Sequence, residues 1–422
     1  MTKMYNKQFD ELGFEIRMIP STNFILKETK NKLYLMFEIQ TQEKKNKTTT
    51  KTPFNLALVL DRSGSMQGQK LDFAKKAVEE VVSNLRISDL LHFVIYDTTV
   101  ETVFENGDLK KKDQLLQRIK KVQSANSTFL SGGLLQGADL VQKYLSKDKS
   151  NRIFIFSDGL ANVGIKSLED LTNVAKQING KGINITSFGI GEDFDEDIMQ
   201  NLAVHGKGDY FFIDQADRIP NIVDEAIEGL LGLVLSNVEL KLSSEKGVDI
   251  KKVYTYSDKI ILGDVRETEI RQVLVEIEVD PTIADPTKLI QFELTYRLIE
   301  DIMNDRTFSD VLSIPYTTNP DDIMKENEDV LLTKHLLETA DKELEISRLV
   351  ENMEFDQAKI NQKDLIDYLK SLKYIDKAGL LKDKIDYLEK AQENLNTSDY
   401  IKARKSMKYS SYLSSYSKLR KK

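Results

Sequence analysis

The sequence ALVLDRSGSM at residues 57–66 joins a run of apolar residues to a short polar loop. The run has the character of a strand buried on both faces, and Asp61, Ser63 and Ser65 follow it at once. If the strand belongs to a parallel sheet, these three oxygen-bearing side chains lie at its carboxyl end, where open α/β sheets bind ligands. Their alternate spacing allows a curled loop to point all three inward.

Residues 53–235 around this stretch alternate between short apolar runs and amphipathic helices. The runs that predict strands are Phe54–Leu60, Leu90–Tyr96, Arg152–Phe156, Asn184–Ile190 and Asp209–Ile213. Apolar residues recur between them at three and four positions, for example at Leu71, Ala74, Val78, Val81 and Leu85. The alternation predicts an α/β fold with a doubly wound, Rossmann-like, mostly parallel sheet. The run Thr99–Phe104 closely follows a strand, so we expect it to pair as an antiparallel edge.

Two further parts of the sequence bring oxygen atoms to the same edge of this sheet. The strand at 153–156 ends in Ser157-Asp158-Gly159, and Thr128 stands just before an amphipathic helix. Hard oxygen ligands without His or Cys select hard cations, chiefly Mg²⁺, with Mn²⁺ or Ca²⁺ as substitutes. Mg²⁺ requires six oxygens and the chain offers fewer, so water or an acidic residue of another protein would complete the shell.

This constellation resembles the metal-ion-dependent adhesion site of the von Willebrand factor type A (VWA) family, whose DxSxS pattern stands here as Asp61-Arg62-Ser63-Gly64-Ser65. The later Thr of the family looks like Thr128, and its strand-end Asp-Gly looks like Asp158-Gly159. The resemblance implies that Asp61, Ser63, Ser65, Thr128 and Asp158 hold the metal, some through water. Many relatives have Gly-Gly before the Thr, where this chain has Asn126-Ser127, so Ser127 stays open as an alternative to Thr128.

The flanking residues predict two further structural regions. Strands before the α/β region have no sheet of their own, so we expect residues 14–52 to complete a β-sandwich with residues 236–318. The VWA domain, residues 53–235, would then be an insertion in this sandwich. Residues 319–422 are predicted to be helical, because residues such as Leu332, Leu336 and Ala340 recur every four positions. This arrangement looks like a bacterial group of VWA proteins.

The composition excludes several classes of protein. With 60 Lys and Arg against 68 Asp and Glu, the net charge is −8, so a general nucleic-acid interface is not expected. There are no cysteines, which excludes disulfides and thiolate sites and fits a reducing cytoplasm. Apolar stretches are far shorter than the roughly 20 residues of a membrane span. We therefore expect a cytoplasmic protein without a membrane span.

The site allows three functions. The preferred one is a non-enzymatic adaptor or scaffold whose metal binds an Asp or Glu of a protein partner, for example an AAA+ ATPase or a larger multiprotein complex. A Mg²⁺-dependent phosphate-transfer enzyme with Asp61 as nucleophile is the second, but Ser63 stands where such enzymes need a second acid. A membrane-associated adhesin or channel regulator is the third. No phosphate-binding glycine motif is present, and no His or Lys is placed by the sequence to activate Ser63 or Ser65, so no catalytic residue is expected.

Overall fold

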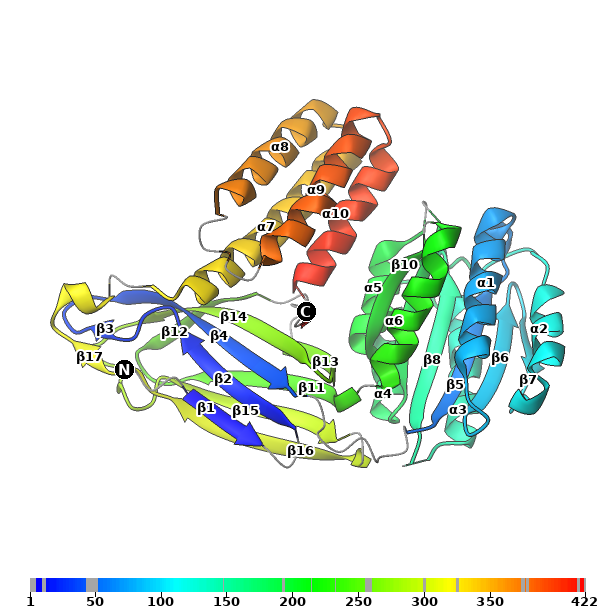
Figure 1. Ribbon diagram of the computed structural model, residues 1–422, viewed down its shortest axis with the longest axis horizontal. Coiled ribbons are helices and arrows are strands. Elements are labelled where there is room, and N and C mark those ends of the chain that lie inside the picture. The colour runs from blue at the N-terminus through cyan, green and yellow to red at the C-terminus, as the bar shows by residue number, and fades with distance from the viewer. Residues whose placement is uncertain are drawn as a thin grey trace. The chain divides into compact units, whose positions relative to one another are not determined.

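The structure of the protein, shown in Figure 1, is a computed structural model. It describes residues 5–9, 13–42, 52–146, 148–191, 194–213, 215–231, 233–254, 260–298, 301–323, 326–372, 376, 379–415 and 418–420. The chain forms two compact units. One comprises residues 1–44, 238–296 and 306–422, and the other comprises residues 45–237 with 297–305.

The second unit contains a six-stranded sheet in the order β10-β9-β8-β5-β6-β7. Neighbouring strands are parallel except for β7, which pairs antiparallel with β6 at the edge. The strands are β5 (Phe54–Asp61), β6 (Leu90–Tyr96), β7 (Val100–Phe104), β8 (Ser150–Ser157), β9 (Asn184–Ile190) and β10 (Lys207–Ile213). The predicted doubly wound sheet and its antiparallel edge are therefore confirmed.

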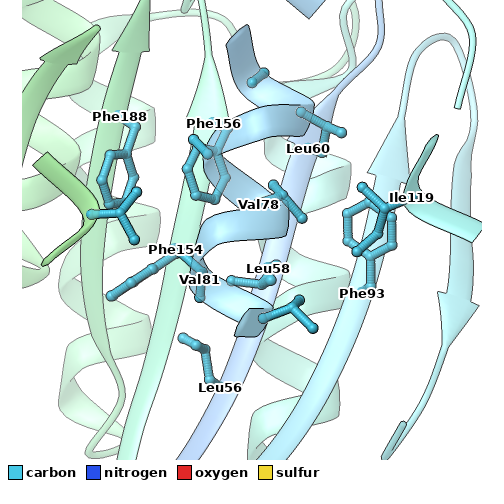
Figure 2. Close-up of a cluster of buried hydrophobic side chains, with 14 of the residues drawn as sticks. Leu56, Leu58, Leu60, Val78, Val81, Phe93, Ile119, Phe154, Phe156 and Phe188 are labelled. Carbon is cyan, nitrogen blue, oxygen red and sulfur yellow. The ribbon is translucent and has the colours of Figure 1, made fainter. Parts of the chain in front are cut away.

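Helices cover both faces of this sheet. Leu56, Leu58 and Leu60 of β5 point to the face covered by α1, α2 and α6, and Figure 2 shows them beside Val78 and Val81 of α1. Alternate residues of β5 point to the opposite face, where α3, α4 and α5 pack. This two-sided burial explains why β5 is apolar at consecutive positions. The helices are α1 (Gln69–Asn84), α2 (Lys112–Lys120), α3 (Leu130–Lys143), α4 (Leu168–Gly180), α5 (Glu196–His205) and α6 (Ile219–Leu231).

The other unit contains a β-sandwich built from both sides of the α/β insertion. One sheet has the order β1-β2-β4-β14-β12, with β18 also on β14, and the second has the order β13-β11-β15-β16. Strand β4 pairs with β14 across more than 200 residues of sequence, which confirms the predicted insertion. The strands are β1 (Tyr5–Phe9), β2 (Phe14–Pro20), β4 (Asn31–Thr41), β11 (Leu233–Ser244), β12 (Val248–Tyr254), β13 (Ile260–Arg266), β14 (Glu269–Val279), β15 (Ile290–Leu298), β16 (Asp301–Leu312) and β18 (Lys418–Arg420), with a separate short pair of β3 (Ile25–Leu26) and β17 (Tyr316–Thr317).

The core of the sandwich lies between its two sheets. The rings of Phe14 and Tyr296 are 5.3 Å apart, and those of Phe37 and Phe292 are 5.6 Å apart, both edge to face. Each pair joins a strand that precedes the α/β insertion in sequence to one that follows it, so aromatic packing adds to the strand pairing in holding the sandwich together.

Four helices follow the sandwich in the described part of the chain: α7 (Glu328–Glu351), α8 (Phe355–Ser371), α9 (Leu380–Asn396) and α10 (Tyr400–Ser415). They share one apolar core, and the first turns of α7 also pack on the sandwich through Val330 and Leu337. Within the described part of the chain, no helix combines the length and apolar character needed to cross a membrane. The four-part division at residues 52, 235 and 318 stays a prediction.

Candidate metal centre

The loops that carry the predicted ligands meet where the strand order of the sheet reverses. Strands β5 and β8 are parallel neighbours, and Leu60 pairs with Phe156, so both strands end at the same level. The connections after these two strands lead to opposite faces of the sheet, and the crevice between them is the usual ligand site of such folds. The sheet therefore brings Asp61 and Asp158 to one edge.

The first loop holds its three candidate ligands close together. Asp61 is fully buried, and its Oδ1 accepts a hydrogen bond of 2.8 Å from the backbone N–H of Ser63. The hydroxyl oxygens of Ser63 and Ser65 lie 3.1 Å apart. Ser63 is buried and Ser65 is exposed, so this loop leads from the interior to the surface.

Thr128 lies between the first loop and the loop that follows β8. The N–H of Gly64 donates to the carbonyl of Asn126 at 2.7 Å, which joins the first loop to the Thr128 loop. The N–H of Thr128 donates to Oδ1 of Asn162 at 2.8 Å, and its carbonyl accepts from the N–H of Asn162 at 3.1 Å. Thr128 is buried, whereas Ser127 is half-buried and donates its N–H to the hydroxyl of Thr98. Burial among the three loops favours Thr128 over Ser127 as the ligand.

Asp158 is fully buried and engaged on both carboxylate oxygens. Its Oδ1 accepts from the N–H of Leu160 at 3.3 Å, and the ammonium of Lys70 lies 3.2 Å from its Oδ2. Its carbonyl accepts from the N–H of Asp195 at 2.7 Å, at the start of α5. The carboxylate is thus held in place by the chain.

Two polar residues of the site were not found from the sequence. Ser157 and Tyr96 both donate to Oδ2 of Asp61, at 2.7 Å and 3.3 Å. Burial raises the pKa of the Tyr96 hydroxyl well above 10.0, so it stays protonated and remains a donor. Ser157 directly precedes Asp158, which is a weak local signal, but only the pairing of Asp61 with Tyr96 in the sheet reveals the tyrosine.

The electrostatics of the site favour a cation. Burial raises the pKa of the Asp61 carboxyl from 3.8 to about 6, hydrogen bonding from Ser63 opposes this rise, and the charge of Asp158 adds to it. A buried carboxylate facing a second one is costly when both are ionised. A divalent ion near both carboxylates would lower this electrostatic cost, so the pair is better suited to a site that binds a cation than to a metal-free site.

The oxygen atoms also fit the size of a small divalent ion. Two adjacent ligands of an octahedral Mg²⁺ lie about 3.0 Å apart when each is about 2.1 Å from the ion, and the hydroxyls of Ser63 and Ser65 are 3.1 Å apart. The described residues contain no group of three His, Cys, Asp or Glu side chains that could hold a metal. The candidate donors are therefore hydroxyls supported by two carboxylates, a set suited to hard ions such as Mg²⁺.

Comparison with known proteins supports the fold of this region. Residues 55–225 match the family model of the von Willebrand factor type A domain. This chain contains a VWA domain. The match covers the six strands and the loops described above, so Asp61, Ser63, Ser65, Thr128 and Asp158 all lie inside the VWA domain. Their role as metal ligands stays a prediction.

Similar proteins are known from several organisms. The chain is 22% identical to the uncharacterized protein sll0103 of Synechocystis over 58% of this chain and 61% of that protein. It is 24% identical to inter-alpha-trypsin inhibitor heavy chain H3 of Rattus norvegicus over 56% of this chain and 28% of that protein. The chain thus spans less than two thirds of the length of either relative.

Two solved structures share the fold of nearly the whole chain. The ArnB paralog VWA2 from Sulfolobus acidocaldarius superposes with a TM-score of 0.63 and 17% identity, covering 94% of this chain and 99% of that one. A von Willebrand factor type A protein from Catenulispora acidiphila gives a TM-score of 0.65 at 16% identity, covering 92% of each chain. At these identities the likeness concerns the fold, which includes the parts that flank the VWA domain.

Proposed function

We propose that the VWA domain is a non-enzymatic, divalent-metal-dependent module that binds a partner protein through an Asp or Glu of that partner. The observation that carries this proposal is the placement of two buried carboxylates, Asp61 and Asp158, beside a pair of hydroxyls 3.1 Å apart, at the switch point of the sheet. Burying two carboxylates near each other costs free energy, and a bound cation would offset that cost.

The hydroxyls of Ser63, Ser65 and Thr128 are the direct ligands in this proposal. Asp61 already accepts three hydrogen bonds on its two oxygens, so in this proposal it contacts the ion through a water molecule or through the hydroxyls around it rather than directly. The hydroxyl ligands are neutral, so the charge of the ion is balanced only by the nearby carboxylates of Asp61 and Asp158, of which Asp158 is itself paired with Lys70. When bound, Mg²⁺ supplies a Lewis-acidic position that a carboxylate from outside can occupy.

The geometry of Asp61 weighs against the phosphate-transfer alternative. A nucleophilic carboxylate needs an oxygen open to the substrate, whereas Asp61 is fully buried and hydrogen-bonded on both oxygens. A binding role makes no such demand on it. We therefore propose an adaptor or scaffold that brings a partner, such as an AAA+ ATPase or a multiprotein complex, to the domains that flank the VWA domain. The cytoplasmic location and the bacterial origin stay predictions.

Metal uptake and partner capture test this proposal in sequence. Titration of the full chain with Mg²⁺ in a calorimeter should show one site that is lost in Asp61→Ala. Affinity capture with wild type and Asp61→Ala, each with Mg²⁺ and with EDTA, should then retain a common protein only for the wild type with Mg²⁺. Asp72→Ala is the matched control, because Asp72 is an exposed carboxylate on α1. The proposal fails if wild type takes up no divalent ion, or if the same partner is captured in EDTA.

A further inference from the structure

Lys70 places a positive charge of the chain itself inside the candidate metal centre. It is the second residue of α1, and its ammonium forms an ion pair of 3.2 Å with Oδ2 of Asp158. The side chain of Lys70 is 18% exposed and that of Asp158 is fully buried. The ammonium gives up part of its hydration at this position, and the ion pair with the buried carboxylate of Asp158 offsets that loss.

The backbone provides room for the aliphatic part of this lysine. Gly191 follows β9 directly and has a φ of +85°. A Cβ atom added to Gly191 would lie 2.7 Å from Cε and 2.9 Å from Cγ of Lys70. The Lys70 side chain thus passes over the end of β9 to reach Asp158, and a side chain at position 191 would displace it.

The charges around the centre then add up in a defined way. Arg62 forms an ion pair of 2.8 Å with Asp97 and a longer one of 3.7 Å with exposed Glu101, whose charge is screened by solvent. Taken by themselves, Asp61, Asp158 and Lys70 carry a single negative charge when both carboxylates are ionised, and a divalent ion beside them would make that sum a single positive charge. Without the ammonium, the two carboxylates would neutralise the ion completely, and the occupied site would attract an incoming carboxylate far less.

We propose that Lys70 is a resident counter-ion of the metal centre that weakens the binding of the divalent ion and strengthens the capture of a partner carboxylate. This inference rests on the proposed function. The ammonium repels the divalent ion but adds to its attraction for an anion. Lys70 is thus a specificity-determining residue that shifts the centre from holding metal tightly to holding the acidic ligand tightly.

A purely structural lysine would behave differently. If Lys70 only held Asp158 in position, its loss would weaken both metal binding and carboxylate binding. The proposal requires the two affinities to move in opposite directions, which makes the two roles separable by measurement.

The experiment uses the full chain with Lys70→Met and Lys70→Gln as two neutral variants and Lys70→Arg as the charge-conserving variant. Lys75→Met is the matched control, because Lys75 lies on the same helix and pairs with exposed Asp72. Mg²⁺ affinity is measured by calorimetry. Carboxylate binding is measured with acetate as the probe, from the loss of water-proton relaxation when acetate displaces water from the Mn²⁺-loaded protein.

The neutral variants should bind Mg²⁺ about tenfold more tightly, the order expected when one ammonium a few ångströms from a divalent ion is removed. They should bind acetate several-fold more weakly, while Lys70→Arg and Lys75→Met stay close to wild type in both assays. Unchanged or weaker Mg²⁺ binding by the folded neutral variants overturns the role of Lys70 and leaves the metal site intact. Absence of Mg²⁺ uptake by the wild type instead overturns the proposed function, and this inference with it.

Discussion

Replacement of Asp61 by Asn should stabilise the metal-free protein while abolishing its response to Mg²⁺. In the folded protein, burial and the nearby Asp158 raise the pKa of Asp61 from 3.8 to about 6. A carboxyl whose pKa is higher in the folded state costs no stability below pH 3.8, where it is protonated in both states. The cost grows as the pH rises towards 6 and is complete above it. At 1.36 kcal/mol for each pH unit, this cost is about 3 kcal/mol at neutral pH.

Asn removes this charge but keeps the shape of the side chain. Its amide oxygen can still accept from the N–H of Ser63, whereas its NH₂ group replaces the acceptor of both the Ser157 and the Tyr96 hydroxyls. The two rearranged hydrogen bonds offset about 1–2 kcal/mol, which leaves a net gain of about 1–2 kcal/mol. For a unit of this size the gain corresponds to a rise in melting temperature of roughly 2–8 °C.

Scanning calorimetry of the full chain in EDTA and in Mg²⁺ measures both effects. In EDTA, the transition of the VWA domain should lie higher in Asp61→Asn than in wild type. Addition of Mg²⁺ should raise the transition of the wild type only, because ligand binding stabilises the folded state. Asp72→Asn, at an exposed carboxylate of α1, should change neither transition. A lower transition for Asp61→Asn in EDTA, or an equal response of both proteins to Mg²⁺, would refute the reasoning.

Three further outcomes follow from buried groups elsewhere in the chain. Burial lowers the pKa of His92 to about 4. As the pH falls, the unfolded state therefore takes up the proton before the folded state does, and the free energy of unfolding should fall by up to about 3 kcal/mol between pH 6.5 and 4. Denaturant unfolding of His92→Gln should depend less on pH over this range. Glu343→Gln leaves the ammonium of Lys384, which is 7% exposed, without its counter-charge. This should lower the free energy of unfolding of the helical region by about 3–5 kcal/mol. The double variant Glu343→Leu with Lys384→Met should recover much of that loss. In Gly137→Ala the new Cβ would lie 2.6 Å from a methyl carbon of β5 and should cost about 1–3 kcal/mol by thermal unfolding, whereas Gly180→Ala, with nothing within 4 Å, should cost little.

The strands and helices of the VWA domain could be read from the sequence because their signals are local. Strand β5 is apolar at every position from 56 to 60 since both of its faces are covered. The strands of the sandwich give weaker signals in the sequence, and β12 shows why. In β12 most side chains are exposed or half-buried, with Lys at two successive positions, so the apolar alternation that predicts a strand is weak.

The candidate ligands could also be named in advance, but their supporting residues could not. Asp61, Ser63 and Ser65 stand together in one motif, and Asp158 follows a recognisable strand. The choice between Ser127 and Thr128 stayed open, because adjacent residues differ in burial only once the loops have packed. The sequence alone thus determined which short segments carry oxygen ligands and which elements present them.

Tertiary structure decided which of these segments meet and what surrounds them. The order of the strands makes β5 and β8 neighbours, and it brings Ser157 to Asp61 across 96 positions of sequence and Lys70 to Asp158 across 88. Hydrogen bonds and ion pairs between residues far apart in the sequence produce no repeating sequence pattern, because they depend on the order of the strands and on the path of each loop. The charge and the hydrogen bonding of the candidate metal centre therefore depend on the folded edge of the sheet, whereas the residues that supply its oxygen atoms can be identified from the sequence.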